Sequence, residues 1–474
     1  MKNTTRLILI LLSLIVCVAI LVACDATRSD VQHGRPDYND QNREDPDDVY
    51  DDDDRDDDDD DRDDDDNGSP DDGNGNGNLG DGEETEEALT ESPHLGDYEY
   101  SDDYTDGLIF EEVYVDEELL RDGYIVVGYT GSSEKVVIPT VYHGKYVRGV
   151  GAESFKDNAI VTEIVVPDGV RYIGEKAFAG CTNLAKLTIG RRVEYIGAAA
   201  INGSTALTDI VIPDSVTTLG ANNLYACTGL KSAVIGKGVT VLESKVFWGC
   251  GELERVSIRG ALTRIDSYVF YKCEKLKAVT LPEGLERIGT WAFQDCDALT
   301  EIDIPASVKR IDETVFYYCN NLERVTFHEG LEVIERSSFG GCSSLVEVHI
   351  PDSVTEIGDY CFRGCDSLKK VTLGNGITRL GNEAFAYCNS LEYNVSGVVR
   401  YLGTEDNPYF ALAGMEDTGT DTCTIEGDVK VIGDYAIGNG VIQYITFYGS
   451  SEEWDAVHRG LDWDYNHPYV EFTE

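Results

Sequence analysis

The amino-acid sequence predicts a repeat solenoid, mainly β in structure, in which short helical or 3-10 turns connect the strands. The first observation is that cysteine recurs with a period of twenty-three, without insertion or deletion, and that the one gap in the series holds Ser204. The second is that leucine and phenylalanine recur with the same period. A fixed period of this length is typical of proteins in which each repeat forms one coil stacked on the last. The cysteines of this series are Cys181, Cys227, Cys250, Cys273, Cys296, Cys319, Cys342, Cys365 and Cys388.

Each coil carries inward-facing apolar residues at fixed places, as residues 276–299 illustrate. Val279 and Leu281 lie two residues apart, so both point to the same side of a strand. Leu285 and Ile288 supply a second inward pair, and a phenylalanine completes the set. No single coil can bury these side chains, so we expect about eleven stacked coils to share one core. This ladder phenylalanine is found at Phe155, Phe178, Phe247, Phe270, Phe293, Phe316, Phe339, Phe362 and Phe385, and Ile201 and Leu224 replace it twice.

The cysteine series has two interpretations. Many cysteines in an exported protein usually form disulfides. Here, however, each ladder cysteine lies at the same inward position, three residues after the phenylalanine and three before a leucine. Neighbouring Cβ atoms would be about 4.8 Å apart, the strand spacing, whereas a disulfide prefers roughly 3.8 Å. We therefore expect buried thiols that bond the backbone of turns, a role that Ser204 can share, and no zinc site.

Residues 1–23 are predicted to be an export signal. Lys2 and Arg6 precede an apolar run, and Leu21-Val22-Ala23-Cys24 resembles a bacterial lipobox. That resemblance implies that Cys24 becomes a lipidated N-terminus. The alternative is a transmembrane helix that ends in cysteine, although the apolar run is at the short end for spanning a bilayer. We expect a lipoprotein anchored at the extracellular face of a bacterial membrane.

Residues 24–106 are predicted to be a disordered stalk rich in Asp, Gly and Asn. Between Asp25 and Asp106 there are 35 Asp or Glu and five Arg, and the whole chain has a net charge of −51. Such a segment has too little apolar surface to fold, and charge repulsion extends it. Weak, diffuse association of Ca²⁺ with the Asp runs is left open. The strong acidity argues against a nucleic-acid partner.

The repeats resemble a known family. Ile304-Pro-Ala-Ser-Val-Lys-Arg-Ile311 followed by Phe316-Tyr-Tyr-Cys-Asn-Asn-Leu322 is similar to the BspA-like leucine-rich repeat family of bacterial surface proteins. The resemblance implies a right-handed leucine-rich-repeat coil stack, with the array over 151–395 and a degenerate repeat with a C-terminal cap over 396–474. The short strands expected at 123–131 and 136–139 lead into the first coil, and we interpret residues 107–150 as an N-terminal cap. Members of that family are secreted or surface-attached, and some bind host matrix proteins or other cells.

The sequence contains no recognisable catalytic constellation. Its seven histidines are scattered, none stands with Ser or Cys in a nucleophile motif, and there is no H-E-x-x-H. We expect a protein that is not an enzyme and that uses no cofactor or metal.

The positions that the repeat does not require are the more informative ones for function. An aromatic residue follows the ladder position in several coils, and others lie nearby. A row of aromatics suits sugars and protein partners, because it offers rigid apolar faces with polar edges. The alternative is that the rings stack on one another and cover the coil edges. The candidate ligand-binding residues are Tyr225, Trp248, Tyr271, Trp291, Tyr317 and Tyr318.

These observations together predict a monomeric, lipid-anchored cell-surface protein that binds an extracellular protein ligand, as an adhesin does. Two alternatives remain open. One is a glycan-binding module that uses the aromatic row, and the other is a structural spacer in the cell envelope. The charged outward positions of the strands are a second candidate surface.

Overall fold

The computed structural model describes residues 104–113, 123–415, 419–437, 442–463 and 468–473. They belong to one compact unit, residues 84–474. The predicted signal peptide, the predicted lipidation site Cys24 and the acidic stalk up to residue 103 lie outside the described residues. None of the helices in the described ranges has the length and apolar composition needed to cross a membrane.

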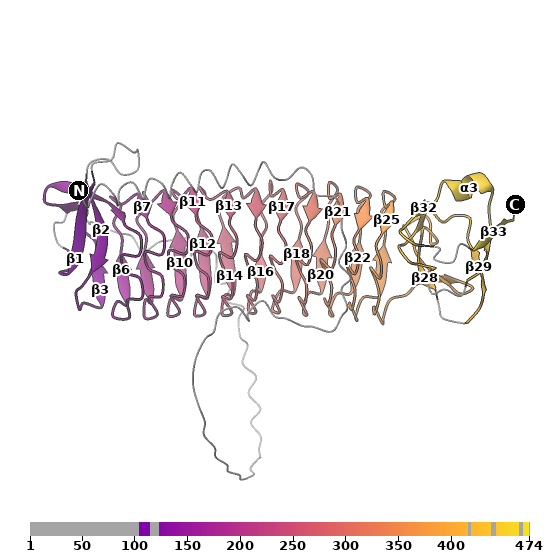
Figure 1. The fold of residues 1–474 in the computed structure, drawn as a ribbon, viewed down its shortest axis with the longest axis horizontal. Helices are drawn as coiled ribbons and strands as arrows, with labels where there is room; N and C mark the ends of the chain where they lie inside the picture. The colour runs from indigo at the N-terminus through magenta and orange to yellow at the C-terminus, as the bar shows by residue number, and fades with distance from the viewer. Residues whose placement is uncertain (1–103, 114–122, 416–418, 438–441, 464–467, 474) are drawn as a thin grey trace, which may run out of the picture. The chain divides into compact units, whose positions relative to one another are not determined.

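Two rows of short parallel strands run along the unit, and Figure 1 shows their strands side by side from indigo to orange. Row 1 comprises β3 (Lys135–Val137), β6 (Glu163–Val165), β8 (Lys186–Thr188), β10 (Asp209–Ile212), β12 (Ser232–Ile235), β14 (Arg255–Ile258), β16 (Ala278–Val279), β18 (Glu301–Asp303), β20 (Arg324–Thr326), β22 (Glu347–His349) and β24 (Lys370–Thr372). Row 2 comprises β5 (Lys145–Val150), β7 (Tyr172–Ile173), β9 (Tyr195–Ile196), β11 (Thr218–Leu219), β13 (Val241–Leu242), β15 (Arg264–Ile265), β17 (Arg287–Ile288), β19 (Arg310–Ile311), β21 (Val333–Ile334), β23 (Glu356–Ile357) and β25 (Arg379–Leu380).

Where neighbouring strands of these rows pair, the pairing follows the repeat without slippage, although row 1 is divided into three sheets and row 2 into two. Ile210 faces Ala233, and Ile288 faces Ile311, so in each case a residue lies beside its equivalent in the next coil. Because side chains alternate along a strand, this register keeps every inward position inward. The predicted inward residues Val279 and Leu281 are each only 7% exposed.

The core is a continuous column of equivalent side chains. The ladder phenylalanines are at most 4% exposed, and most of their rings stack on those of the neighbouring coils. The Phe293 ring, for example, lies 4.9 Å from Phe270 and 5.2 Å from Phe316 between ring centres. Five of these rings, those of Phe270, Phe293, Phe316, Phe339 and Phe362, contact two others, as expected for a core that the coils share.

A third side of each coil, which we call the turn side, runs from two residues before the ladder phenylalanine to two residues after it. We call the place of that phenylalanine the ladder position. Residues at both ends of this segment have a left-handed backbone, for example Trp291 with φ 58° and Asp295 with φ 57°. A left-handed φ is unfavourable for residues other than glycine, so the surrounding structure must hold it. Backbone hydrogen bonds to the next coil do so. The amide of Phe293, for example, donates to the carbonyl of Val315 at 2.9 Å, and the amide of Asp295 donates to that of Tyr317 at 3.1 Å.

The fold class agrees with the prediction, but two details differ. The connections expected as short helical or 3-10 turns are single hydrogen-bonded turns, and α3 (Ser451–Asp455) is the only helix among the described residues. The described chain also completes about 15 turns rather than about eleven. The additional turns arise because segments expected as caps continue the stack: Tyr124 already faces Val147 one repeat later.

The two ends complete the unit. At the N-terminal end, β1 (Leu108–Val113) pairs antiparallel with β2 (Gly123–Tyr129), and β4 (Val141–Tyr142) pairs with β5. At the C-terminal end lie β26 (Asn394–Ser396), β27 (Val399–Leu402), β28 (Ala411–Met415), β29 (Thr422–Ile425), β30 (Val431–Ile432), β31 (Tyr444–Phe447), β32 (His458–Arg459) and β33 (Tyr469–Phe472). The amide of Asp434, just after β30, donates to the carbonyl of Leu380 in β25, so the chain returns to the array after an excursion through β26 to β30.

Candidate functional site

Three of the six aromatic candidates form a row on the turn side, and their rings cover one another. Tyr225 and Trp248 stack with their ring centres 4.5 Å apart and their planes parallel, and Trp248 and Tyr271 lie 5.6 Å apart at 9°. Tyr271 is only 4% exposed. Parallel rings at these distances leave mainly their edges open. The arrangement therefore matches the stacking alternative more closely than an open platform for a sugar.

The other candidates lie at different places on the turn side. Trp291 occupies the left-handed position before the ladder phenylalanine and packs on Tyr268, with 4.6 Å between ring centres. Tyr318 occupies the left-handed position after it, contacts Tyr317 at 4.2 Å and is 39% exposed. The six candidates are thus brought onto one side of the stack, but not into one continuous row.

A patch of tyrosine and arginine side chains lies near the end of the array. Its tyrosines are among the aromatic residues near the row, but its arginines were missed by the sequence analysis. It consists of Arg336, Tyr360, Arg363 and Tyr387, and we call it the Tyr–Arg patch. The Arg336 and Arg363 guanidiniums lie 5.1 and 5.5 Å from the Tyr360 ring centre, and Arg363 lies 4.9 Å from that of Tyr387. These are cation–π distances. Tyr387 is 64% exposed, and both tyrosines occupy left-handed positions of the turn side.

The outward positions of row 1 carry charges that pair between neighbouring coils. Arg324 and Glu301 are 2.7 Å apart, and Lys277 and Glu254, each just before a row 1 strand, are 2.9 Å apart. Most of these side chains are more than half exposed, so each pair contributes little to stability. These charged side chains already pair with one another within the array. This surface is therefore a weaker candidate for ligand binding than the Tyr–Arg patch.

The cysteine ladder has the geometry of a packing element. All of its cysteines are buried and free. The Sγ of Cys296 donates to the carbonyl of Phe270 at 3.2 Å, and the Oγ of Ser204 makes the equivalent bond to Phe178 at 3.3 Å. Burial raises the pKa of Cys227 and of Cys342 to about 12. Thiols of this kind are poor nucleophiles at neutral pH.

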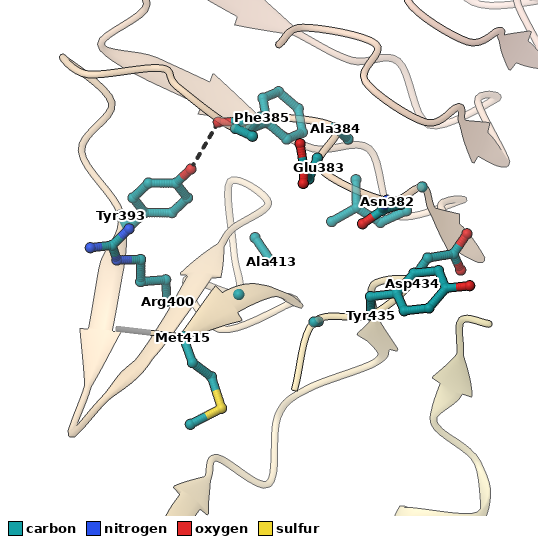
Figure 2. Close-up of a pocket in the computed structure, with 15 residues that line it drawn as sticks. Asn382, Glu383, Ala384, Phe385, Tyr393, Arg400, Ala413, Met415, Asp434 and Tyr435 are labelled. Carbon is teal, nitrogen blue, oxygen red and sulfur yellow. Dashed lines mark hydrogen bonds between the residues drawn. The ribbon is translucent and has the colours of Figure 1, made fainter. Parts of the chain in front are cut away.

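One cavity lies where the regular array ends, and Figure 2 shows the side chains around it. It encloses about 280 Å³ between residues 380–386 of the last regular coil and residues 434–436, with 413–415 on a further wall. Tyr393 donates from its hydroxyl to the carbonyl of Phe385 at 3.3 Å, and the Arg400 guanidinium lies 5.5 Å from the Tyr393 ring centre. Among the described residues, no group of His, Cys, Asp and Glu side chains could hold a metal ion.

The repeat pattern identifies the family. Residues 148–277 and 263–392, together more than half of the chain, match the sequence model of the BspA type leucine rich repeat region, in six copies. The chain belongs to the BspA-type leucine-rich repeat family. The resemblance stated from the repeats is therefore confirmed.

Solved structures of bacterial proteins are similar to this BspA-type chain. A leucine-rich repeat protein from Bacteroides ovatus is 23% identical, with a TM-score of 0.47 and matches over 79% of this chain and 100% of that one. A leucine rich cell surface protein from Faecalibacterium prausnitzii is 23% identical, with a TM-score of 0.35 over 75% and 97%. The pneumococcal vaccine antigen PcpA is 15% identical, with a TM-score of 0.38 over 78% and 98%. No curated protein matches the BspA-type chain, and the family assignment rests on the repeat match.

Proposed function

We propose that this BspA-type chain is a lipid-anchored cell-surface protein that binds other extracellular proteins and performs no chemistry. The observation that carries the proposal is the Tyr–Arg patch. Tyrosine and arginine are the residue types that most often dominate protein interfaces, because they combine large apolar area with directional polar groups. Rigid presentation lowers the entropy lost on binding.

Backbone geometry supports a rigid presentation of Tyr360 in this patch. The amide of Tyr360 donates to the carbonyl of Asn382 at 2.8 Å, which fixes the left-handed turn from which the ring projects. Arg363 is in turn held between the two tyrosines and pairs with Glu383 at 3.5 Å. A partner with a carboxylate and an apolar side chain would complement these groups.

Glycan binding is the second candidate function. Exposed tyrosines such as Tyr318 and Tyr387 favour it, because a sugar ring can stack on an open aromatic face. The stacked rings of Tyr225, Trp248 and Tyr271 do not offer such faces, which makes the protein ligand the stronger proposal.

The proposed anchor is a lipid on Cys24, a residue outside the described ranges. The basic start, the apolar run and the lipobox-like Leu21-Val22-Ala23-Cys24 support it. Mass spectrometry of the N-terminal peptide from the membrane fraction tests it. The expected result is a chain that begins at Cys24 and carries acyl chains, and an unprocessed N-terminus would contradict it.

The ligand class is tested by binding the full-length chain to a panel of extracellular-matrix proteins and, in parallel, to a glycan array. The proposal expects saturable binding to at least one protein and none to glycans. Binding to glycans alone would support glycan binding, the second candidate function. No binding in either assay would favour a structural spacer.

A further inference from the structure

The turn side carries a regular ladder of backbone hydrogen bonds between coils. Each coil contributes three amides: one at the position of the ladder phenylalanine, one two residues before it and one two residues after it. In ten successive coils, these amides donate to carbonyls of the next coil. Tyr360, Phe362 and Gly364, for example, donate to Asn382, Ala384 and Ala386. All of these amides point towards the C-terminal end of the stack, so the last coil presents a row of donors.

The last regular coil has no described acceptors for these donors. Glu383 and Tyr387 keep the left-handed backbone, with φ 50° and 58°, so this coil has the same geometry as those before it. Yet the amides of Glu383, Phe385 and Tyr387 make no hydrogen bond with any described residue. Phe385 is buried, and an unpaired donor on a buried residue is rare in folded proteins because it loses free energy when it is removed from water. Glu383 and Tyr387 are exposed residues, whose amides water can reach.

The facing wall presents the complementary acceptors. By the register of the ladder, the carbonyls of Asp434 and Ala436 belong opposite these amides, and neither accepts a hydrogen bond from any described residue. The adjoining Tyr435 does continue the ladder, since its amide donates to the carbonyl of Leu461 at 3.0 Å. The ladder is therefore intact on both sides of the cavity and interrupted only across it.

The cavity between these walls leaves room for a backbone. Ala384, Ala413, Gly414 and Ala436 line it, and such small side chains allow another main chain to approach closely. The buried carboxylate nearby already has partners: that of Asp434 accepts from Arg379 at 2.7 Å and from the Leu461 amide at 2.7 Å. Apart from the Tyr435 hydroxyl, the groups that line the cavity without a described partner are main-chain groups.

We propose that this cavity binds a short extended polypeptide segment of a partner protein, which takes the place of one missing rung. Its carbonyls accept from Glu383 and Phe385, and its amides donate to Asp434 and Ala436. An anion would satisfy only the donor wall, whereas a polypeptide backbone satisfies both, as in recognition by strand addition. The inference deepens the proposed function, on which it rests, by naming the chemistry of the partner.

The test is hydrogen exchange of the full-length protein, resolved to single amides by mass spectrometric fragmentation. The probe is a synthetic peptide, Gly-Asn-Glu-Ala-Phe-Ala-Tyr, which copies the rung sequence of residues 381–387. In the free protein, we expect the amides of Glu383 and Phe385 to exchange at least tenfold faster than those of Tyr360 and Phe362. The amide of Tyr435, which donates to the carbonyl of Leu461, is the control: fast exchange there would indicate local unfolding of this part of the chain rather than unpaired amides. Saturating peptide should slow the first two amides at least tenfold.

Matched variants and probes make the outcome decisive. Ala413→Trp fills the cavity and should abolish the protection, whereas Ala185→Trp, at an exposed position elsewhere in the array, should leave it unchanged. A peptide N-methylated at its Glu and Phe residues should not protect. Protection of both amides in the free protein would overturn the inference, as would equal protection by acetate or by the N-methylated peptide, or no protection at all. These outcomes are separate from the proposed binding of proteins, which fails if the protein panel is silent.

Discussion

At the residue scale, cysteine suits its place in the ladder because its side chain is small and its thiol is a weak hydrogen-bond donor. Each thiol fills a buried position and donates to a carbonyl of the preceding coil, as Cys319 does to Phe293 at 3.1 Å. Ser204 makes the same bond with a hydroxyl. The position thus requires a small side chain that can hydrogen-bond, and cysteine meets this with the smallest loss of apolar character.

The ladder thiols are expected to resist alkylation in the native protein. Burial raises the pKa of most of these thiols, to about 11 for Cys181 and about 12 for Cys227, so they hold almost no thiolate at pH 8. Cys388 is the exception, because a hydrogen bond with Cys365 lowers its pKa. Apart from Cys388, iodoacetamide labelling of the ladder should be negligible at pH 8 and should rise as the pH approaches these values. In denaturant without reductant, all of the ladder cysteines should label. Only one or two reactive thiols in denaturant would contradict the prediction and indicate disulfides.

The left-handed turn positions predict opposite effects of two substitutions. Thr314 has φ 55° and a buried hydroxyl without a hydrogen-bond partner, so Thr314→Gly should stabilise the protein by about 1 kcal/mol. Gly249 has φ 71°, and a Cβ added there would meet no atom within 4 Å. Gly249→Ala should therefore destabilise the protein by about 1 kcal/mol through backbone strain alone. Denaturant midpoints measure both, and changes of the same sign would be inconsistent with the account.

At the element scale, the sequence predicts the strands better than the turns. Val279, Leu281, Leu285, Ile288 and Phe293 are all buried as predicted, because period-two alternation and the repeat register leave no other arrangement. The left-handed turns were not predicted, since tyrosine, lysine and aspartate occupy many of these positions and glycine occupies only the second of them, in five coils: Gly180, Gly203, Gly249, Gly341 and Gly364.

The candidate site was predicted only in part, for related physical reasons. Spacing brought the aromatic candidates to one side of the stack, but it could not show that Trp248 stacks between two tyrosines. The partners of Arg363 depend on the turn geometry, which the sequence did not indicate. The cavity depends on a return of the chain from Leu380 to Asp434, which no repeat period encodes.

The junction between the array and the C-terminal segment depends on Arg379. Its guanidinium pairs with Asp359 at 3.0 Å and with Asp434 at 2.7 Å, and the Asp434 side chain is only 2% exposed. Arg379→Met would leave that buried carboxylate without its cation, so we expect a loss of about 3 kcal/mol in the stability of the C-terminal segment. Hydrogen exchange at residues 431–437 measures it.

A matched variant separates the charge effect at this junction from lost packing. Arg379→Met combined with Asp434→Asn removes both charges and should recover most of the lost stability. Unchanged exchange in the single variant would show that the ion pair does not hold the junction.

At the scale of the whole molecule, the coils form one nearest-neighbour system. Stability is then approximately a sum over coils and their interfaces. Phe293→Ala removes a ring that contacts rings on both sides, and should cost about 3–5 kcal/mol. Because coupling passes only between neighbours, we expect the single unfolding transition to separate into two. Chemical denaturation followed by circular dichroism measures this, and a small shift of one intact transition would argue against nearest-neighbour coupling.

The central claim is that function lies in positions that the repeat leaves free, foremost the Tyr–Arg patch. The most direct measurement is the affinity of the full-length chain for its protein ligand after Arg336, Tyr360, Arg363 and Tyr387 are all replaced by Ser. The matched control replaces four row 1 charges by Ser, namely Glu301, Arg324, Glu347 and Lys370. The account predicts at least a hundredfold loss of affinity in the patch variant, little change in the control, and similar melting temperatures. Retained binding in the patch variant, with loss in the control, would contradict it.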